Sequence, residues 1–365
     1  MARKIFIAAT GQHSGKTITS LSLMHLARKK YARVGFIKPL GPKPVPYRGG
    51  FYDKDAVVMA EVFGLQEQIG LMSPVVLHPA STREVLDGRV DAADFRQRMA
   101  AAIAELDARN DFLIIEGSGH GGVGSVIGLS NAEIARIAGA PVMIVAGGGI
   151  GNATDSVVLN LALFRQEGVP VKLVLINKLL ADKRESTMRY LQLAFARHDV
   201  SVRGGFNYSP ILANPTLSRI AKILNRPLRA TPEEARRIIH HIQLGAASSQ
   251  RVIDLLEEAT LMVVNSTRDE LIVTASSLYH LPNYREKIAG LVIAGLNPMS
   301  AITQTILDDS QVPYLRTEIT NSEAFSIVTS DVSKITAEDT EKLDLVRKMA
   351  DSDLDFDAID ALIQG

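Results

Sequence analysis

A glycine-rich segment near the N-terminus carries the residue types that bind phosphate. Residues 10–17 read Thr-Gly-Gln-His-Ser-Gly-Lys-Thr, directly after an apolar run that ends at Ala9 and directly before an amphipathic stretch. Glycines let backbone N–H groups converge on phosphate oxygens, and a helix that starts there adds the positive end of its dipole. We therefore predict a nucleotide-phosphate loop formed by Gly11, Gln12, His13, Ser14, Gly15, Lys16 and Thr17.

Two side chains of this loop have distinct chemistry. Lys16 is expected to reach the β- and γ-phosphates as a catalytic cation, and the Thr17 hydroxyl is expected to ligate Mg²⁺. The alternative is a glycine-rich turn with an incidental Gly-Lys-Thr, because Thr10 stands where the standard pattern has glycine. The flanking strand and helix patterns favour the phosphate loop, and His13 is expected to shape the turn rather than to act as a base.

Polar side chains also end other apolar runs of the N-terminal half. Lys38 ends the run 34–38, and Glu116 ends the run 112–116. Ligands of open α/β sheets gather beyond the carboxyl ends of the strands. Lys38 is therefore a candidate catalytic cation that faces phosphate or a substrate carboxylate, unless it is a surface lysine with its stem packed on the protein. Glu116 is a candidate Mg²⁺ ligand, since P-loop proteins hold the ion with an acid at this position.

Two further residues each have a functional and a structural interpretation. Asp55 starts a predicted helix, so it is either a Mg²⁺ ligand or an acid stabilised by the helix dipole. Asn177 ends the run 171–177 and either reads the adenine base or caps the strand. The pair Asn177-Lys178 is similar to part of a guanine-reading motif, without the Asp that follows at the usual spacing. ATP is the predicted nucleotide, and GTP remains the alternative.

The composition of the 365-residue chain fits a globular protein of about two domains. Hydrophobic residues make up 46% and charged residues 22%, and Lys plus Arg equals Asp plus Glu at 40 each. This balance gives no field that favours nucleic acid or an anionic membrane, and no apolar run approaches the ~18 residues that span a bilayer. The chain has no cysteine, which excludes disulfides and thiolate metal sites and fits a cytoplasmic location.

Over the first ~210 residues, short β-branched runs alternate with longer amphipathic stretches, which predicts a parallel sheet wrapped by helices. The predicted strands are Lys4–Ala9, Val34–Lys38, Phe112–Glu116, Pro141–Ala146 and Val171–Asn177, and the predicted helices are Thr17–Lys29, Ala92–Ala108 and Ala153–Gln166. Continuous apolar runs of this kind suit strands that are covered on both faces. The predicted fold class is α/β, P-loop NTPase-like, with a parallel sheet and helices on both faces.

A second α/β block follows the loop markers Tyr208-Ser209-Pro210 and Asn214-Pro215. Its predicted helices are Thr231–Leu244, which begins with a Thr-Pro-Glu-Glu cap, and Thr336–Met349. Its predicted strands are Leu261–Asn265, Leu271–Thr274 and Gly290–Ala294, and a predicted acidic tail covers Asp351–Asp360. We therefore predict two domains, a P-loop domain over 1–220 and a smaller α/β domain over 221–365.

Together these motifs resemble the dethiobiotin synthetase family, which also includes the N-terminal domain of long phosphate acetyltransferases. The similarity covers residues 1–220 and is carried by residues 10–17, Gly35–Pro39, Asp55-Ala56, Glu116–Gly119 and Asn177. It is closer to the acetyltransferases in three further segments, which are Gly121–Ser125, Leu129–Ala132 and Gly147–Gly151.

The second domain is similar to the DRTGG domain, which follows this P-loop domain in those acetyltransferases. Ser266–Glu270 and Ala289–Gly295 stand near the two motifs that give the domain its name, and both motifs are altered. The resemblance implies a regulatory or interaction role for 221–365. The acetyltransferase catalytic domain would need about 300 residues beyond position 365, so we expect no production of acetyl phosphate. The family forms dimers, which implies a homodimer.

The resemblance implies that ATP activates a carboxylate as a mixed anhydride. Lys16, Thr17, Lys38, Asp55 and Glu116 match the MgATP machinery of the family. The loop after Lys38-Pro39 lacks the small hydroxyl-bearing residues of the family's substrate side. One hypothesis is MgATP hydrolysis or phosphoryl transfer to a carboxylate of an unidentified small molecule. The other is a catalytically weak, nucleotide-sensing protein that regulates a protein partner through the DRTGG-like domain. The residues leave open whether the chain is an enzyme.

Overall fold

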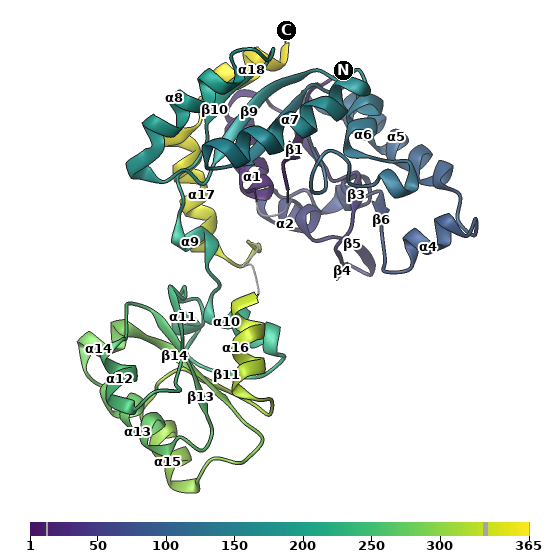
Figure 1. The fold of residues 1–365 in the computed structure, drawn as a ribbon. Helices are drawn as coiled ribbons and strands as arrows, with labels where there is room; N and C mark the ends of the chain where they lie inside the picture. Colours follow the sequence, from purple (N-terminus) through teal and green to yellow (C-terminus); the bar gives the residue numbers. More distant parts are fainter. Residues whose placement is uncertain (12–13, 331–334, 365) are drawn as a thin grey trace. The chain divides into compact units, whose positions relative to one another are not determined.

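A computed structural model describes residues 1–11, 14–330 and 335–364 of the chain (Figure 1). The chain divides into two compact units, of which the first combines Met1–Tyr208 with Ile335–Gly365 and the second is Ser209–Lys334. The second unit is therefore inserted in the sequence of the first. The predicted division into 1–220 and 221–365 differs from this one, because the C-terminal helices pack against the first unit.

A six-stranded parallel sheet forms the centre of the first unit. Its strand order is β10-β9-β8-β1-β7-β2, and every neighbouring pair runs parallel. The strands are β1 (Arg3–Ala9), β2 (Val34–Ile37), β7 (Phe112–Glu116), β8 (Val142–Gly147), β9 (Val171–Asn177) and β10 (Ser201–Gly204). Every residue of β7 is buried, as expected for a strand covered on both faces. The predicted parallel sheet is confirmed.

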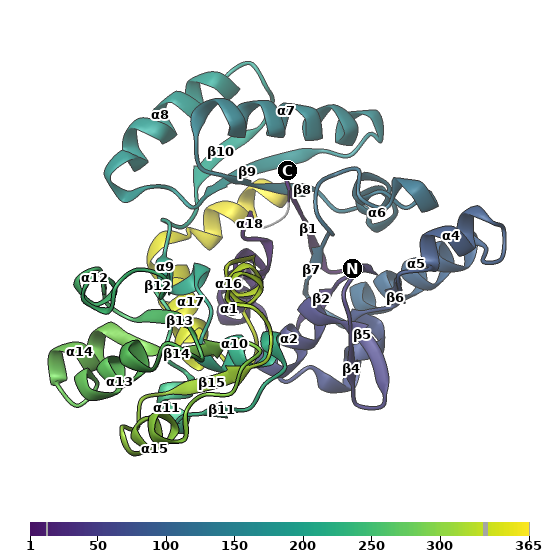
Figure 2. The ribbon, with the colours of Figure 1, turned by 60° about the horizontal axis from the view of Figure 1, so that its bottom comes forward.

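Helices cover both faces of this sheet (Figure 2). On one face, the sheet shares its core with α5 (Ala92–Arg109), α6 (Asn131–Ala138), α7 (Ile150–Gln166) and α8 (Arg184–Phe195). On the other face lie α1 (Lys16–Lys30), α17 (Thr340–Asp353) and α18 (Phe356–Gln364). There α1 packs on β1 and β7, α18 packs on β1 and β9, and α17 packs along α1. No helix among the described residues is long and apolar enough to cross a membrane.

The helix α1 begins where the chain turns out of β1. Gly15 precedes it in the left-handed region, with a φ of 99°, which glycine adopts without steric cost. The last turn holds Arg28, Lys29 and Lys30, whose positive charges interact favourably with the negative end of the helix dipole. The predicted strand–loop–helix connection is therefore present, and its helix presents the positive end to the loop.

A β-hairpin follows β2 and returns the chain to the carboxyl end of the sheet. It consists of β4 (Pro44–Tyr47) and β5 (Gly50–Asp53), joined by Arg48 and Gly49 with φ values of 47° and 82°. Positive φ at both positions is typical of a two-residue hairpin turn. The helix α2 (Lys54–Phe63) starts directly after β5. The remaining short elements are β3 (Leu40–Gly41) paired with β6 (Val75–Val76), α3 (Ile69–Met72), α4 (Ser81–Leu86) and the 3₁₀ helices η1 (Gln66–Gln68), η2 (Ser125–Ile127) and η3 (Ala181–Lys183).

The second unit is also built as an α/β unit. Its sheet has the order β11-β15-β14-β13-β12, in which β12 to β15 are parallel and β11 is antiparallel to β15. The strands are β11 (Leu228–Arg229), β12 (His241–Leu244), β13 (Thr260–Asn265), β14 (Ile288–Ala294) and β15 (Tyr314–Thr317). The helices are α9 (Pro210–Ala213), α10 (Leu217–Leu224), α11 (Pro232–Ala235), α12 (Ser249–Asp254), α13 (Asp269–Leu278), α14 (Pro282–Lys287), α15 (Ala301–Asp309) and α16 (Asn321–Ser330). The sheet shares one core cluster with α10 and α16 and another with α12, α13 and α15.

Two predicted elements of the second unit are wrong. Of the predicted helix Thr231–Leu244, only α11 is helical, and the chain then enters the strand β12. Pairing with β13 outweighs the local preference for helix there. The predicted strand Leu271–Thr274 belongs to α13, in which Leu271, Ile272 and Ala275 are buried at helical spacing. A short apolar run does not by itself distinguish a strand from a helix.

The predicted acidic tail Asp351–Asp360 is also wrong, because this segment is structured. It contains the end of α17 and the start of α18, and Phe356 and Ile359 of α18 are buried. The predicted helix Thr336–Met349 corresponds to α17, which begins and ends a few residues later. Apolar side chains spaced between the acids therefore fix both helices on the first unit.

Candidate nucleotide and metal site

The predicted phosphate loop connects the end of β1 to α1. Two features favour glycine at position 15. Its φ is positive, and a Cβ atom added there would stand only 2.1 Å from Nδ2 of Asn177. Ser14 is buried, and its Oγ donates to the carbonyl oxygen of Gly11 at 3.2 Å. Of the predicted loop residues, Gln12 and His13 lie outside the described residues.

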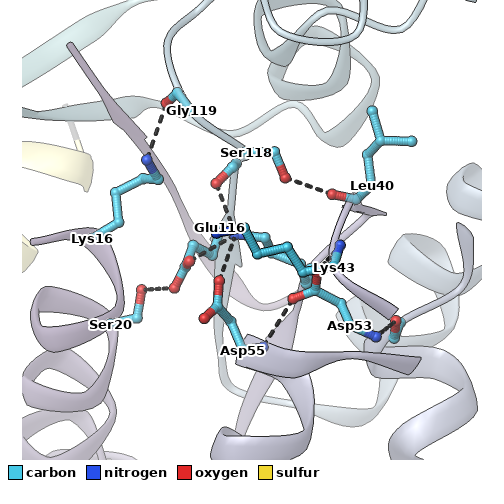
Figure 3. A network of polar contacts seen from close by, with 12 residues as sticks. Lys16, Ser20, Leu40, Lys43, Asp53, Asp55, Glu116, Ser118 and Gly119 are labelled. Carbon is cyan, nitrogen blue, oxygen red and sulfur yellow. Dashed lines mark hydrogen bonds and ion pairs between the residues drawn. The ribbon is translucent and has the colours of Figure 1, made fainter. Parts of the chain in front are cut away.

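Lys16 and Thr17 lie in the first turn of α1. The Nζ of Lys16 donates to the carbonyl oxygen of Gly119 at 3.1 Å and to that of Gly11 at 3.5 Å. Lys16 therefore spans from the phosphate loop to the loop after β7, as Figure 3 shows. Thr17 is half-buried. Both side chains therefore lie at the positive end of α1. An anion at this position would be attracted by the helix dipole and by the Lys16 ammonium.

Lys38 follows β2 and is buried, with 3% of its surface exposed. Its Nζ lies 2.8 Å from Oε1 of Glu116, 3.0 Å from the carbonyl oxygen of Gly117 and 3.4 Å from Oδ2 of Asp55. Burial lowers the pKa of the Lys38 ammonium, but the charges of Glu116 and Asp55 raise this pKa by more, so the net direction is upward. Lys38 is therefore an interior cation held by two carboxylates, and the alternative of a surface lysine is wrong.

Glu116 is fully buried at the end of β7. Its Oε1 accepts from Lys38, and its Oε2 accepts from Oγ of Ser20 at 2.6 Å (Figure 3). Ser20 was missed by the sequence analysis, although the signal was available. It stands four residues after Lys16 in the same helix and therefore faces the same side. Ser20 fixes the orientation of the Glu116 carboxylate relative to the phosphate-loop helix.

The β4–β5 hairpin brings a second acid beside Asp55. Asp53 is buried, and its Oδ1 accepts from the backbone N–H of Asp55 at 2.9 Å as the N-terminal cap of α2. Burial raises the pKa of Asp53 most, Lys38 lowers it and Asp55 raises it, which gives a pKa of about 6. Asp53 was also missed by the sequence analysis, although an Asp directly before a helix is typical of a cap. Asp55 lies in the first turn of α2, as the helix-dipole interpretation expects, and it also contacts Lys38. Its role as a Mg²⁺ ligand stays a prediction.

Asn177 joins the phosphate loop to the end of β9. Its Nδ2 donates to the carbonyl oxygen of Ser14 at 3.1 Å, and its Oδ1 accepts from the backbone N–H of Phe206 at 3.1 Å. Only 3% of Asn177 is exposed. The amide is thus engaged on both sides by backbone, which gives Asn177 a structural role at the loop. Adenine recognition by Asn177 stays a prediction.

The predicted metal ligands are chemically suited to Mg²⁺, which takes oxygen ligands and usually keeps several waters and substrate phosphates. Asp55 and Glu116 both contact the Lys38 ammonium, so this position already favours a positive charge. Within the described residues, no group of three or more His, Cys, Asp and Glu side chains could hold a metal ion by itself. Completion of such a site by the Thr17 hydroxyl and by nucleotide phosphate stays a prediction.

A comparison with family models gives a match that covers the first unit up to Tyr208 and the start of the second. The model described as an AAA domain, AAA_26, matches residues 3–223, which is more than half of the chain. The match begins with β1 and includes the phosphate loop, Lys38, Glu116 and Asn177. The first unit is a P-loop NTPase-type domain.

Curated proteins with similar sequences agree with the predicted resemblance. The chain is 23% identical to a phosphate acetyltransferase of Synechocystis sp. over 312 residues, which cover 84% of this chain and 44% of that protein. It is 31% identical to a cobyric acid synthase of Pelotomaculum thermopropionicum over 204 residues, 50% of this chain and 39% of that protein. It is 24% identical to an ATP-dependent dethiobiotin synthetase of Methanocaldococcus jannaschii over 177 residues, 47% of this chain and 78% of that protein. The chain thus spans less than half of the length of the first two relatives.

Proposed function

The chain belongs to the AAA_26 family of AAA domains, and on this premise we propose that its first unit binds MgATP and transfers the γ-phosphoryl group to the carboxylate of a small molecule. The observation that carries the proposal is the buried cluster of Lys38, Asp55 and Glu116 at the carboxyl ends of β2 and β7. Burying charged groups is costly even when they are paired, so a buried charge cluster suggests a functional role. Placed beside a phosphate loop, these charges suit phosphoryl transfer, in which electrostatic stabilisation supplies most of the catalysis.

Each residue has a role in this reaction. The loop from Gly11 to Thr17 cradles the phosphates, and Lys16 neutralises the β- and γ-phosphate oxygens. Thr17, Asp55 and Glu116 would hold Mg²⁺, and a bound ion would neutralise negative charge on the phosphates. Lys38 lies on the opposite side of Glu116 from Ser20 and supplies a second positive charge to the transferring group or to the incoming carboxylate.

The proposed transfer needs no general base. A carboxylate oxygen of the substrate attacks the γ-phosphorus, and the bond from this phosphorus to the β–γ bridging oxygen breaks. ADP leaves with the electron pair of that bond, and the product is an acyl phosphate. Water in place of the carboxylate would give ATP hydrolysis instead. The dethiobiotin synthetase among the relatives is named as ATP-dependent, which supports ATP as the nucleotide.

A nucleotide sensor is the second candidate. The observation that favours it is the insertion of the second unit between Tyr208 and Ile335. The first unit resumes at Ile335, shortly before α17, and α17 packs along α1. The phosphate loop stands at the start of α1, so a nucleotide bound there would contact the helix on which α17 packs. A homodimer, a cytoplasmic location and a regulatory role of the second unit remain predictions.

Formation of ADP decides between the two candidates, because both phosphoryl transfer and hydrolysis produce it. The full chain is incubated with ATP and Mg²⁺, alone and with a panel of small mono- and dicarboxylates, and ADP formation and ATP binding are measured in parallel. ADP formation that disappears in Lys16→Ala, but persists in the exposed control Lys183→Ala, supports the enzyme. Tight ATP binding without ADP formation under any carboxylate contradicts phosphoryl transfer and leaves the sensor.

A further inference from the structure

A cavity of about 530 Å³ lies at the edge of the first unit's sheet. The edge strand β10, the helix α8 and the connection from α17 to α18 surround it. These elements lie side by side in Figure 1 and all belong to the first unit. Pockets for small molecules typically measure roughly 300–1,000 Å³, so this cavity is large enough for a ligand and not only for water. It is separate from the phosphate loop and from the Lys38 cluster, whose residues do not line it.

Opposite charges line this cavity without pairing across it. Arg184 of α8 and Arg203 of β10 supply positive charge, and Asp353 and Asp355 of the α17–α18 connection supply negative charge. Among the described residues, neither arginine forms an ion pair with either aspartate. The cavity therefore separates its two arginines from its two aspartates by more than contact distance.

Arg184 and Asp355 form hydrogen bonds with neutral partners. Nη1 of Arg184 donates to the carbonyl oxygen of Gly205 at 2.8 Å and to Oδ1 of Asn207 at 2.9 Å. These two bonds fix the guanidinium beside Gly204, at the base of the cavity wall. Oδ1 of Asp355 accepts from the backbone N–H of Ala358 at 2.9 Å. Both groups are held in place while their charge stays available to a ligand.

Neighbouring acids behave differently. Asp351 contacts Lys29 at 2.6 Å and His25 at 3.0 Å, and Asp360 contacts Lys30 at 2.9 Å. Acids of the C-terminal helices that face α1 are thus paired with its basic residues. Asp353 and Asp355 lie between them in the sequence and face the cavity instead. Pairing with α1 explains the flanking acids, whereas Asp353 accepts from Oγ of Ser352 at 2.7 Å and Asp355 caps α18 through the N–H of Ala358.

Apolar side chains form another part of the cavity lining. Leu175 of β9, Leu354 and Ile359 line the cavity and are almost fully buried. A ligand that fits this lining has a carboxylate for the arginines, a neighbouring ammonium for the aspartates and a short aliphatic side chain for the apolar residues. We propose that the cavity binds a small zwitterion of the α-amino acid class, with its carboxylate toward Arg184 and Arg203 and its ammonium toward Asp353 and Asp355.

Binding has a structural consequence for the C-terminal helices. The ligand bridges the α17–α18 connection to β10 and α8, and so holds α17 and α18 in place on the first unit. A ligand that binds only the folded chain stabilises it in proportion to the logarithm of its concentration over Kd. Occupancy of the cavity is therefore measurable as a rise in the melting temperature of the full chain, independently of any nucleotide chemistry.

Thermal unfolding of the full chain tests the proposal. Each of the common α-amino acids is added singly at about 10 mM, with acetate and methylammonium as probes for the two separate charges. At least one amino acid should raise the melting temperature by about 2 °C or more, and neither half-probe should do so. The same shift should appear in Lys16→Ala, because the site is separate from the phosphate loop. The test therefore stands even if the proposed phosphoryl transfer fails.

Charge-removing variants locate the site. Arg203→Gln and Asp355→Asn should each weaken the affinity for that amino acid about tenfold or more by calorimetry. Asn at position 355 keeps a side-chain oxygen for the N–H of Ala358, so α18 keeps its cap. The matched controls Arg189→Gln and Asp182→Asn change exposed charges that do not line the cavity, and they should bind like the unchanged chain.

Four outcomes would overturn the proposal. In the first, no amino acid shifts the melting temperature. In the second and third, acetate alone or methylammonium alone gives the full shift, which would make the cavity a site for a simple anion or a simple cation. In the fourth, both cavity variants keep the affinity of the unchanged chain, which would place the bound amino acid elsewhere.

Discussion

At the scale of single residues, the Lys38 ammonium and the proposed Mg²⁺ compete for the same carboxylates. Lys38 holds Oε1 of Glu116 and Oδ2 of Asp55, and both acids are also the predicted metal ligands. A cation with such partners neutralises them, so it lowers their attraction for a second cation. Lys38 is therefore expected to weaken the binding of a free divalent ion while it strengthens the binding of an anionic nucleotide.

Replacing Lys38 by Met separates these two effects. The variant keeps most of the side-chain volume and removes the charge. Loss of one partner from a buried ion pair costs about 3–5 kcal/mol of unfolding free energy. Added Mn²⁺ should recover much of this loss, because the ion replaces the ammonium between the acids. We expect the affinity for Mn²⁺ alone, measured from free Mn²⁺ by electron paramagnetic resonance, to rise about tenfold or more, and phosphate release from MgATP to fall roughly 10²-fold.

The prediction is specific because Mn²⁺ affinity should rise while phosphate release falls. If Lys38 only fills space, Mn²⁺ affinity and phosphate release should both stay near those of the unchanged chain. If Lys38 acts on phosphate alone, release should fall while Mn²⁺ affinity stays constant. Lys183→Met, at an exposed lysine of the same unit, is the control for the loss of a surface charge.

Ser20 gives a second prediction at this scale. Ser20→Ala removes the donor to Oε2 of Glu116 and leaves that buried oxygen without this partner. The expected loss of unfolding free energy is about 1–3 kcal/mol. The concentration of Mg²⁺ that gives half-maximal phosphate release should also rise, since the Glu116 carboxylate loses its fixed orientation.

Ser22→Ala is the matched control for Ser20→Ala. Ser22 lies on the same helix and is equally buried, but its Oγ donates to the carbonyl oxygen of Ile18. A purely structural effect would change the two variants alike, with no change in Mg²⁺ dependence. An unchanged Mg²⁺ requirement in Ser20→Ala would therefore argue against a positioning role.

At the scale of elements, one buried carboxylate of α18 contacts residues of β1 and of the end of α1. Oδ2 of Asp360 accepts from Tyr31 at 2.7 Å and from Arg3 at 2.9 Å, and it pairs with Lys30 at 2.9 Å. The side chain of Asp360 has no exposed surface. Burial alone would raise the pKa of Asp360, but these donors outweigh burial and lower it. Because this pKa is lower in the folded chain than in the unfolded chain, folding is stabilised above the unfolded pKa and this stabilisation is lost as the pH falls.

Asp360→Asn should therefore destabilise the chain in a pH-dependent way. At about pH 7 the variant should lose roughly 1–3 kcal/mol of unfolding free energy, and the difference should shrink as the pH falls below about 4. Urea unfolding at both pH values measures it. Asp357→Asn is the control, because the exposed Asp357–Lys30 pair should contribute about 0–1 kcal/mol. A difference that does not depend on pH would contradict the role of the Asp360 charge.

The elements also show what the sequence could predict. Strands buried on both faces, such as β7 and β9, appear as continuous apolar runs, and all predicted strands of the first unit are present. The predicted helix Thr231–Leu244 is wrong because part of it pairs with β13 as a strand. The predicted strand Leu271–Thr274 is wrong because its apolar residues are buried on one face of a helix. The sequence placed Lys38 and Glu116 at the ends of two strands, but it did not predict that Lys38 contacts Glu116 and Asp55 of α2. The roles of Ser20 and Asp53 could not be identified from a short motif. The role of Ser20 depends on which face of α1 it lies on, and that of Asp53 depends on the β4–β5 hairpin.

At the scale of the whole molecule, the segment 335–365 completes the first unit. It supplies α17 and α18, which cover the face of the sheet that also carries α1. Removing it would expose the apolar side chains that α1 and β1 bury there. Burial of apolar surface contributes about 25 cal/mol per Å², so the loss of two helices from one face is large compared with a typical net stability of about 5–15 kcal/mol.

Two shortened chains test this division of the molecule. The first ends at Tyr208, and the second joins Tyr208 to Ile335 through a flexible linker of about 20 Gly and Ser residues, which removes the second unit and keeps α17 and α18. We expect the first to lose cooperative thermal unfolding and ATP binding. The second should unfold cooperatively and bind ATP within about threefold of the full chain, because additive behaviour is expected of units with separate cores.

If the chain that ends at Tyr208 folds and binds ATP as well as the linked one, α17 and α18 are not part of the nucleotide unit. If the linked chain folds but has lost ATP binding, the second unit contributes to the site itself, and a sensor in which both units take part becomes the better description.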